Sequence, residues 1–357
     1  MAFLKSMLRP NRWPLWIGGL VGILILVWLL RDLDLSRFVA VVRDADLRPL
    51  ALLPLAVVVE QVFRAVKWWR LLTPLRSVGL ARLFGAIMAG YLVNTLAPVR
   101  VSPLVRAWLI ARLEGLSVGA VLATVATDRL VDGWIFLGLA AVVVSATSFP
   151  AVGGALAGGL WQGLAGGLIA LLAAVAGLWE LKRLVDRPPR MVQRLARRLP
   201  ARPARVLGDF VRRFAEGLVL PRGLGALAVI LGASVAMKAL AATHFVWAGY
   251  AFGIVLSPPQ YLFLMVFLGF LVTLAGTLRI VGGFTAGAVY GLGLFGVEVE
   301  KALAMAVVVE TASHLTVLAV GAASLWLEGL SLSALRLWRT PAEDGDRGEA
   351  QDDLGRS

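Results

Sequence analysis

Long stretches without any charged residue are the feature that most restricts what this chain can fold into. They lie between Asp132 and Glu180, between Lys238 and Arg279, and from Ile280 to Val297. Each is at least as long as the ~18 apolar residues that indicate a membrane-spanning helix. The chain is 59% hydrophobic and 16% charged, whereas soluble proteins have roughly 25% charged residues. The sequence therefore predicts an all-α, polytopic helical membrane protein.

We expect about eight spans in two repeat-like halves, with one or two helices broken or re-entrant. The expected apolar segments are Leu15–Leu30, Leu50–Val66, Leu83–Val99, Val118–Thr127 continuing into Leu130–Ser148, Ala155–Trp179, Leu224–Ala242, Tyr261–Leu278, Ile280–Val297 and Ala302–Leu327. The first follows a basic N-terminus, as in a signal peptide, but Arg31 and Asp32 come next instead of a small-residue cleavage site. We interpret it as a retained first span.

A basic segment, residues 181–222, divides the expected transmembrane domain 1–330 into halves of about 1–180 and 223–330. It holds 12 of the 35 basic residues of a chain whose net charge is +13. In a membrane protein such a segment indicates a cytoplasmic loop beside anionic lipid, and we expect no nucleic-acid partner. Two short amphipathic helices on the membrane surface are expected in it from the spacing of Val192, Leu195 and Leu199 and of Val206, Phe210 and Phe214. A solvated connector is the alternative. Residues 340–357 form an acidic tail that we expect to be disordered.

Composition excludes several kinds of site. The chain has no cysteine, which rules out disulfides, thiolate catalysis and cysteine metal sites. His244 and His314 are the only histidines, and we interpret each as a polar residue bonded between helices. No GxxxxGK[ST] loop accompanies the basic segment, so nucleotide hydrolysis has no support. We expect no cofactor and no metal site.

The stretch GYLVNTLAPVRVSPLVRAW, which starts at Gly90, places costly residues in an apolar region. Pro98 and Pro103 cannot both sit inside an undisturbed helix, because proline lacks a backbone donor and clashes one turn back. Broken backbone at membrane depth is tolerated only where protein or water covers it. Asn94, Arg100 and Arg106 could therefore present donors to an anionic headgroup. The alternative is an ordinary cytoplasmic loop that obeys the positive-inside rule.

Other ionisable residues fall inside expected spans, where they usually face the bundle interior. Glu60 and Arg64 are four residues apart in the order that favours an ion pair. In TDRLVDG, Asp128 and Asp132 share a helix face, and Arg129 can reach Asp132. Each group can instead be a structural or interfacial salt bridge. Lys238 is isolated, and we expect it to snorkel to the outer surface.

The second half repeats the pattern of the first. Setting Gly90 against Gly269 aligns Arg100 with Arg279, which is followed by Gly282 and Gly283. With three residues inserted, Asp128 aligns with Glu310, and Arg279 is the natural partner of Glu310 by sign. Internal repeats with broken helices at corresponding positions are typical of secondary transporters.

Several motifs resemble one known family, the flippase-like transmembrane region of lysylphosphatidylglycerol synthases and their stand-alone relatives. The resemblance extends from Leu15 to Leu327. The motifs that carry it are RAVKWWRLL, NTLAPVR, VRAWLIARLEGLSVGAVLATVATDRLVDG and VGGFTAGAVYGLGLFGVEVEKALAMAVV. The resemblance implies movement of aminoacylated phospholipids, hopanoids or polyprenyl-linked sugars between leaflets. Because the chain ends soon after Leu327, we expect the translocator half without the synthase half.

The chain departs from the family pattern at five places. Val101 and Ser102 stand where the family usually has Gly-Glu, and Val281 replaces a proline. The acid expected shortly afterwards falls near Ala288, and Glu310 lies where a basic residue is usual. The fold that the resemblance implies is compatible with these departures, but the family's substrate cannot be carried over to this chain.

From these features we expect a protein of a bacterial inner membrane that translocates an anionic phospholipid or lipid-linked intermediate. The candidate substrate-binding residues are Asn94, Arg100, Arg106, Asp128, Arg129, Asp132, Arg279, Gly282, Gly283 and Glu310. No catalytic residue is assigned. The alternative is an intramembrane accessory subunit or transferase in lipid or polyprenyl-sugar synthesis, for which Glu310 and His314 form the only candidate dyad. Lipid-synthesis enzymes are possible partners of the basic segment.

Charge distribution predicts that both termini, the loop Lys67–Arg82 and the basic segment are cytoplasmic and that Arg31–Arg48 is external. Reporter fusions at Arg12, Arg205 and Arg339 should all show cytoplasmic activity. Periplasmic activity of the Arg205 fusion would contradict this topology.

Overall fold

The computed structural model describes residues 20, 24, 27, 31, 33–96, 101–147, 153–187, 201–278 and 282–327. Residues 153–157, 201–204 and 273–278 are described by their backbone only. Most of the expected first span Leu15–Leu30 lies outside the described residues, as do Pro98, Arg100, Arg279, Val281 and the tail 340–357.

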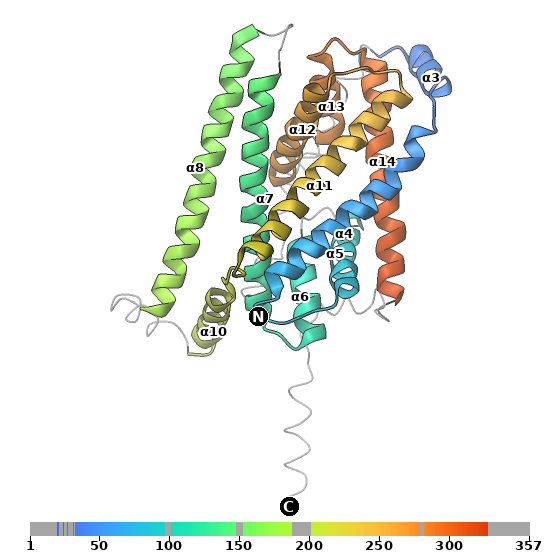
Figure 1. The fold of residues 1–357 in the computed structure, drawn as a ribbon. Coiled ribbons are helices and arrows are strands. Elements are labelled where there is room, and N and C mark those ends of the chain that lie inside the picture. Colours follow the sequence, from blue (N-terminus) through green and yellow to red (C-terminus); the bar gives the residue numbers. More distant parts are fainter. Residues whose placement is uncertain are drawn as a thin grey trace, which may run out of the picture.

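The described part of the chain contains helices and no strand (Figure 1). The elements are α3 (Leu35–Arg43), the 3₁₀ helix η1 (Pro49–Ala51), α4 (Leu52–Leu72), α5 (Leu80–Leu96), α6 (Ser102–Glu114), α7 (Val118–Ala146), α8 (Gly153–Asp186), α10 (Ala201–Gly217), α11 (Leu224–Ala251), α12 (Pro258–Leu278), α13 (Gly283–Gly293) and α14 (Val299–Leu327). Within the described ranges, five segments are long and apolar enough to cross a membrane: Pro49–Leu72, α7, Gly158–Asp186, α11 and α14. The prediction of a polytopic helical membrane protein is confirmed.

The two ends of the bundle can be told apart by their contacts. At the α3 end, α3 lies beside the start of α14, and the Asp46 amide donates to the carbonyl oxygen of Ala251 at the end of α11. At the α10 end, α10 packs against the start of α7 and against α8. The charge distribution assigned two segments to the cytoplasmic side, Lys67–Arg82 and residues 181–222. Their described parts lie at the α10 end (Figure 1). The described part of Arg31–Arg48, which was expected to be external, lies at the α3 end (Figure 1).

Helices α5 and α6 form a hairpin that opens at the α10 end. Arg82 at the start of α5 forms an ion pair with Glu114 at the end of α6, 2.5 Å between Nη1 and Oε1. Gly90 of α5 lies directly against Ser102 at the start of α6. The end of α5 and the start of α6 therefore lie at the end of the hairpin farthest from the α10 end.

Helices α12 and α13 form a second hairpin with the opposite orientation. Gly291 lies against Leu264 and Gly287 lies against Leu268 and Leu271, so the two arms are antiparallel. The start of α12 lies near the end of α7, where Thr147 Oγ1 is 3.5 Å from the carbonyl oxygen of Pro259. This hairpin opens at the α3 end. These two hairpins contain the places where the proline and glycine positions predicted broken or re-entrant helices, and their re-entry into a membrane stays a prediction.

The backbone at each hairpin turn follows from the local sequence. The Asn94 side chain accepts hydrogen bonds from the amides of Val101 and Ser102 at 2.9 and 2.8 Å, which satisfies donors left free at the start of α6. Pro103 lies in the first turn of α6, where its missing N–H is not needed. In the second hairpin Gly282 precedes α13 in the left-handed conformation, with φ of 74°, which glycine adopts without strain.

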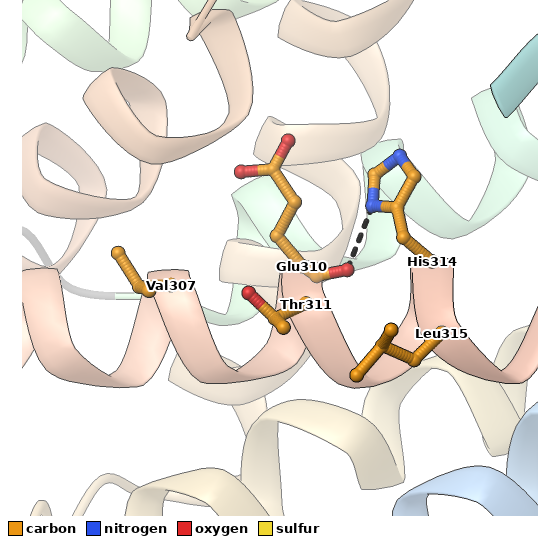
Figure 2. Close-up of a pocket in the computed structure, with 5 residues that line it drawn as sticks. All are labelled: Val307, Glu310, Thr311, His314 and Leu315. Atoms are coloured by element: carbon orange, nitrogen blue, oxygen red, sulfur yellow. Dashed lines mark hydrogen bonds between the residues drawn. The ribbon is translucent and has the colours of Figure 1, made fainter. Parts of the chain in front are cut away.

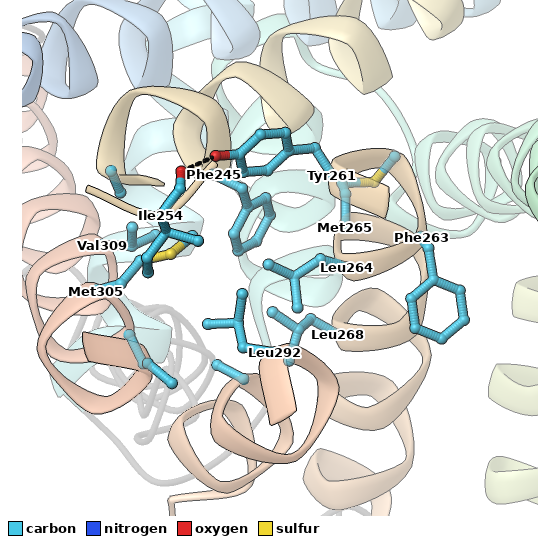
Figure 3. Packing of buried hydrophobic residues seen from close by; sticks show 14 of the residues in the cluster. Phe245, Ile254, Tyr261, Phe263, Leu264, Met265, Leu268, Leu292, Met305 and Val309 are labelled. Carbon is cyan, nitrogen blue, oxygen red and sulfur yellow. Dashed lines mark hydrogen bonds between the residues drawn. The ribbon is translucent and has the colours of Figure 1, made fainter. Parts of the chain in front are cut away.

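Two apolar cores lie at opposite ends of the bundle. The core at the α3 end joins the last part of α11 to α12, α13 and the first part of α14, and Figure 3 shows Phe245, Leu264, Leu292 and Met305 converging there. The core at the α10 end joins the last part of α4 to α5, α6 and the first part of α7. Each hairpin therefore belongs to one core.

The expected amphipathic helix in the basic segment is present as α10. Val206 and Leu207 are exposed on it, while Ala215 is buried. The other expected amphipathic stretch, residues 192–199, lies outside the described residues. The placement of α10 on the membrane surface stays a prediction.

Replacing Gly90 by alanine should destabilise the first hairpin. A Cβ at this position would lie 2.7 Å from Ser102 Oγ and 2.9 Å from its carbonyl oxygen, so α5 and α6 would have to separate. We expect a loss of ~1–3 kcal/mol, typical of overpacking, seen as a lower thermal unfolding midpoint in detergent. Gly138→Ala is the control, because a Cβ there meets nothing within 4 Å. Equal midpoints for the two variants would contradict the close approach of α5 and α6.

Candidate functional site

A cluster of buried charges joins α4, α6 and α7. Lys67 of α4 lies at its centre, with its Nζ 2.6 Å from Asp128 Oδ1 and 2.5 Å from Asp132 Oδ1. The side chains of Lys67 and Asp128 are fully buried. Since the two aspartates are one turn apart on α7, both carboxylates reach the same ammonium group.

Arg64 extends this cluster along α4. Its Nη2 lies 3.2 Å from Glu60 Oε1, which confirms the pair expected from the four-residue spacing. Its Nε donates to Gln61 Oε1 at 3.0 Å, and its Nη1 is 3.7 Å from Asp132 Oδ2. The sequence had suggested a pair between Asp132 and Arg129. Asp132 instead pairs with Arg64 and Lys67 of α4.

Arg106 brings α6 into the cluster. Its Nη2 donates to Asp128 Oδ2 at 2.8 Å, and its guanidinium group lies 4.8 Å from the ring centre of Trp68. The Trp68 indole in turn donates to Thr124 Oγ1 at 3.0 Å. Trp68 is fully buried, so it is part of the core, whereas a place in an interfacial aromatic belt would require exposure.

We call these residues the charge cluster: Glu60, Arg64, Lys67, Arg106, Asp128 and Asp132. Its three cations and three carboxylates cancel in formal charge. Their side chains are between 0 and 16% exposed. Charges at such depth persist only when they are paired, because desolvating a lone ion costs several kcal/mol. The cluster therefore fixes three helices together. Each of its cations is paired with a carboxylate, although Arg106 Nε is buried without a hydrogen-bond partner among the described residues.

A separate groove that holds two titratable side chains lies on α14. It has a volume of about 290 Å³ and is lined by Val307, Glu310, Thr311, His314 and Leu315. Figure 2 shows Glu310 and His314 projecting to the same side of the helix. The Glu310 carboxylate accepts a hydrogen bond from Thr285 Oγ1 of α13 at 2.9 Å. Unlike the charge cluster, this groove leaves polar atoms accessible.

The histidines differ from the expectation of bonds between helices. His314 Nδ1 lies 2.7 Å from the backbone carbonyl oxygen of Glu310, within its own helix. His244 of α11 is buried, and its Nε2 has no hydrogen-bond partner among the described residues. In the candidate dyad, the His314 imidazole is therefore hydrogen-bonded to the backbone carbonyl oxygen of Glu310 and not to the Glu310 carboxylate.

The remaining candidate residues fall into three groups. Asn94 and Gly282 shape the hairpin turns, and Gly283 begins α13. Arg129 is exposed on α7, and no salt bridge within the described residues includes it. Arg100 and Arg279 lie outside the described residues, so their expected approach to one cavity stays a prediction. The partnership of Arg279 with Glu310 stays a prediction for the same reason.

Sequence reasoning missed Lys67 and misplaced Lys238. Lys67 was assigned to a cytoplasmic loop, but α4 continues to Leu72 and places it one turn after Arg64. Lys238 was expected to snorkel outward. Its Nζ instead lies 5.6 Å from the ring centre of Phe136 on α7, close enough to Asp132 and Glu60 to interact with their charges.

Removing one carboxylate from the charge cluster should destabilise the protein strongly. Asp128→Asn would leave Lys67 and Arg106 with one anion fewer, at a cost of ~3–5 kcal/mol, measured as a lower unfolding midpoint. Adding Lys67→Met restores the balance of charge and should recover part of the loss. The control Asp209→Asn, at an exposed pair on α10, should change stability by less than ~1 kcal/mol. Similar midpoints for Asp128→Asn and Asp209→Asn would contradict this account.

Comparison with known proteins gives one match. No curated protein and no solved structure matches the chain. A family described as the lysylphosphatidylglycerol synthase TM region matches residues 15–321. This range contains both hairpins, the charge cluster and the α14 groove. The chain therefore belongs to the lysylphosphatidylglycerol synthase TM region family.

Proposed function

We propose that this protein moves an anionic phospholipid or lipid-linked intermediate between the leaflets of a bacterial inner membrane. The observation that carries the proposal is the pair of oppositely oriented hairpins, both packed on α14. A charged headgroup cannot cross hydrocarbon without polar groups that replace its water. Hairpins that end inside a bundle supply such groups at membrane depth.

The contacts along α14 indicate how the two hairpins could serve one path. Gly321 of α14 lies against Leu92 of α5, and Glu310 binds Thr285 of α13. These two places are eleven residues apart, or ~16 Å along the helix. α5 runs from the α10 end toward Glu310, and α13 begins beside it. The inner ends of both hairpins therefore approach the same part of α14.

The sequence places an arginine between the arms of each hairpin, Arg100 in the first and Arg279 in the second. Guanidinium groups bind phosphate in a bidentate manner. Each cation of the charge cluster is already paired with a carboxylate, so Arg100 and Arg279 are the better candidates for the headgroup. We place the cluster in a supporting role, in which it holds α4, α6 and α7 in register.

The alternative of an intramembrane transferase or accessory subunit needs a base and a nucleophile in contact. His314 binds a backbone carbonyl oxygen and does not contact the Glu310 carboxylate, so the geometry supports this alternative less well. For the topology we keep both termini and the α10 end on the cytoplasmic side, where the basic segment faces anionic lipid.

Blocking the groove should stop translocation. The chain has no cysteine, so Thr311→Cys, exposed in the groove, can be labelled alone with a bulky membrane-permeant maleimide. The unlabelled variant in liposomes should move fluorescent phosphatidylglycerol between leaflets, as measured by dithionite quenching, and the labelled variant should be at least ~10-fold slower, a difference of ~1.4 kcal/mol in the barrier.

The control is Ile169→Cys, which is 67% exposed on α8, a helix whose contacts in the bundle are with α7 and α10. Its labelling should leave the rate unchanged. Wild-type protein that moves no lipid faster than empty liposomes, for any headgroup offered, would contradict the proposed function.

A further inference from the structure

We propose that Glu310 and His314 of α14 form a proton-binding site that couples lipid movement to a proton gradient. The inference rests on the proposed function and adds its source of energy. The site is the α14 groove, in which one carboxylate and one imidazole lie a single helical turn apart and project to the same side (Figure 2).

The hydrogen bonds leave one acceptor free on each residue. Thr285 Oγ1 donates to Glu310 Oε2, while Oε1 has no hydrogen bond to the described residues. A carbonyl oxygen can only accept, so the His314 nitrogen 2.7 Å from the Glu310 carbonyl, Nδ1, carries the hydrogen. In the neutral ring this assigns the lone pair to Nε2. Glu310 Oε1 and His314 Nε2 can therefore both take up a proton.

The site lies well inside the expected membrane thickness. Glu310 is eleven residues from the start of α14 and seventeen from its end, or ~17 and ~25 Å along the helix. It lies beside the start of α13, toward which the first hairpin also points. A proton bound here changes the charge of the site at the place where both hairpins approach.

The helices around α14 bring few charges to this site. α13 has no charged residue, and Tyr290, its one phenol, is exposed. On α5, Arg82 pairs with Glu114 at the far end of the hairpin, and Tyr91 lies 5.8 Å from the Arg64 guanidinium.

The charges of α3, α4 and α11 are engaged elsewhere. Those of α4 that belong to the charge cluster neutralise one another, and Arg70 lies over the Trp69 ring. α11 contributes Lys238, whose ammonium group lies over the Phe136 ring, and His244, which is buried. α3 lies at the far end of α14, where Arg37 pairs with Asp34, and Arg43 lies in its last turn.

The ligand set fits a proton better than a metal ion. Hard cations such as Ca²⁺ take six or more oxygen ligands. The described groove offers as oxygen ligands one carboxylate and the Thr311 hydroxyl, with the Thr285 hydroxyl beside the carboxylate, which is fewer than such an ion takes. A proton needs one acceptor. It would leave water in the compartment of lower pH, bind the Glu310 carboxylate directly or through His314 Nε2, and return to water on the other side. One O–H bond forms and the same bond breaks, so no co-reactant is needed.

The test uses full-length protein in liposomes with fluorescent phosphatidylglycerol, an imposed pH gradient and a membrane potential clamped to zero. If one proton moves with each lipid, a gradient of one pH unit should change the ratio of probe between leaflets about tenfold, since one pH unit corresponds to 1.36 kcal/mol. Glu310→Gln mimics the protonated acid, so it should exchange lipid while keeping a ratio close to that at equal pH. His314→Gln should respond to the gradient more slowly than wild type, and Glu310→Asp should respond as wild type does.

The matched control is Glu298→Gln, next to α14, whose carboxylate is 66% exposed and pairs with Lys301. It should respond to the gradient as wild type does. A wild type that ignores the gradient while moving lipid would overturn the proposal, and so would a Glu310→Gln variant that still follows the gradient.

A second measurement separates this proposal from the proposed function. Infrared difference spectra of the protein in vesicles, recorded over the pH range of the transport assay, should show a carboxylic-acid band that is present in wild type and Glu298→Gln but absent in Glu310→Gln. This result would support a proton site even if no lipid moved, in which case only the proposed function would fail. Identical spectra for wild type and Glu310→Gln would overturn the proton site whatever the transport result.

Discussion

The structure depends on the salt-bridge network in which Lys67 of α4 pairs with two aspartates of α7. An ammonium group with no water around it is tolerated only because Asp128 and Asp132 lie within 2.6 Å of it, and Arg106 and Arg64 complete the pairing from two helices. Such a network need not add net stability relative to apolar packing, but it penalises any arrangement that breaks a pair. It therefore selects one register among helices that apolar contacts alone would let slide.

Much of the fold could be predicted from the sequence because the membrane imposes simple rules on it. Apolar length located the five long helices, whereas the expected segments Leu83–Val99 and Ile280–Val297 hold the shorter helices α5 and α13. The prolines and glycines near Arg100 and Arg279 marked where helices stop, as Leu96, Ser102 and Gly282 show. The direction of each hairpin could not be read this way. It depends on contacts between residues that are far apart in the sequence, such as Arg82 and Glu114.

The candidate site was predicted less well, for a physical reason. Sequence shows which residues are costly in a membrane but not which of them offset one another. Asp128, Asp132 and Arg106 were identified as a possible polar path, yet they are buried partners of a lysine that had been assigned to a loop. Periodicity could have found Lys67, since Glu60, Arg64 and Lys67 lie on one face of a helix that runs six residues past Val66. Thr285 carried no signal, because a threonine in an apolar helix is common.

The presence of two separate cores has a mechanical consequence. Each hairpin is packed into the core at its own end, while α7, α11 and α14 contribute residues to both. Among the described residues, the two hairpins are therefore linked through these three long helices and not through a common apolar core. Because the two cores share no buried residue, repacking one of them leaves the buried contacts of the other intact.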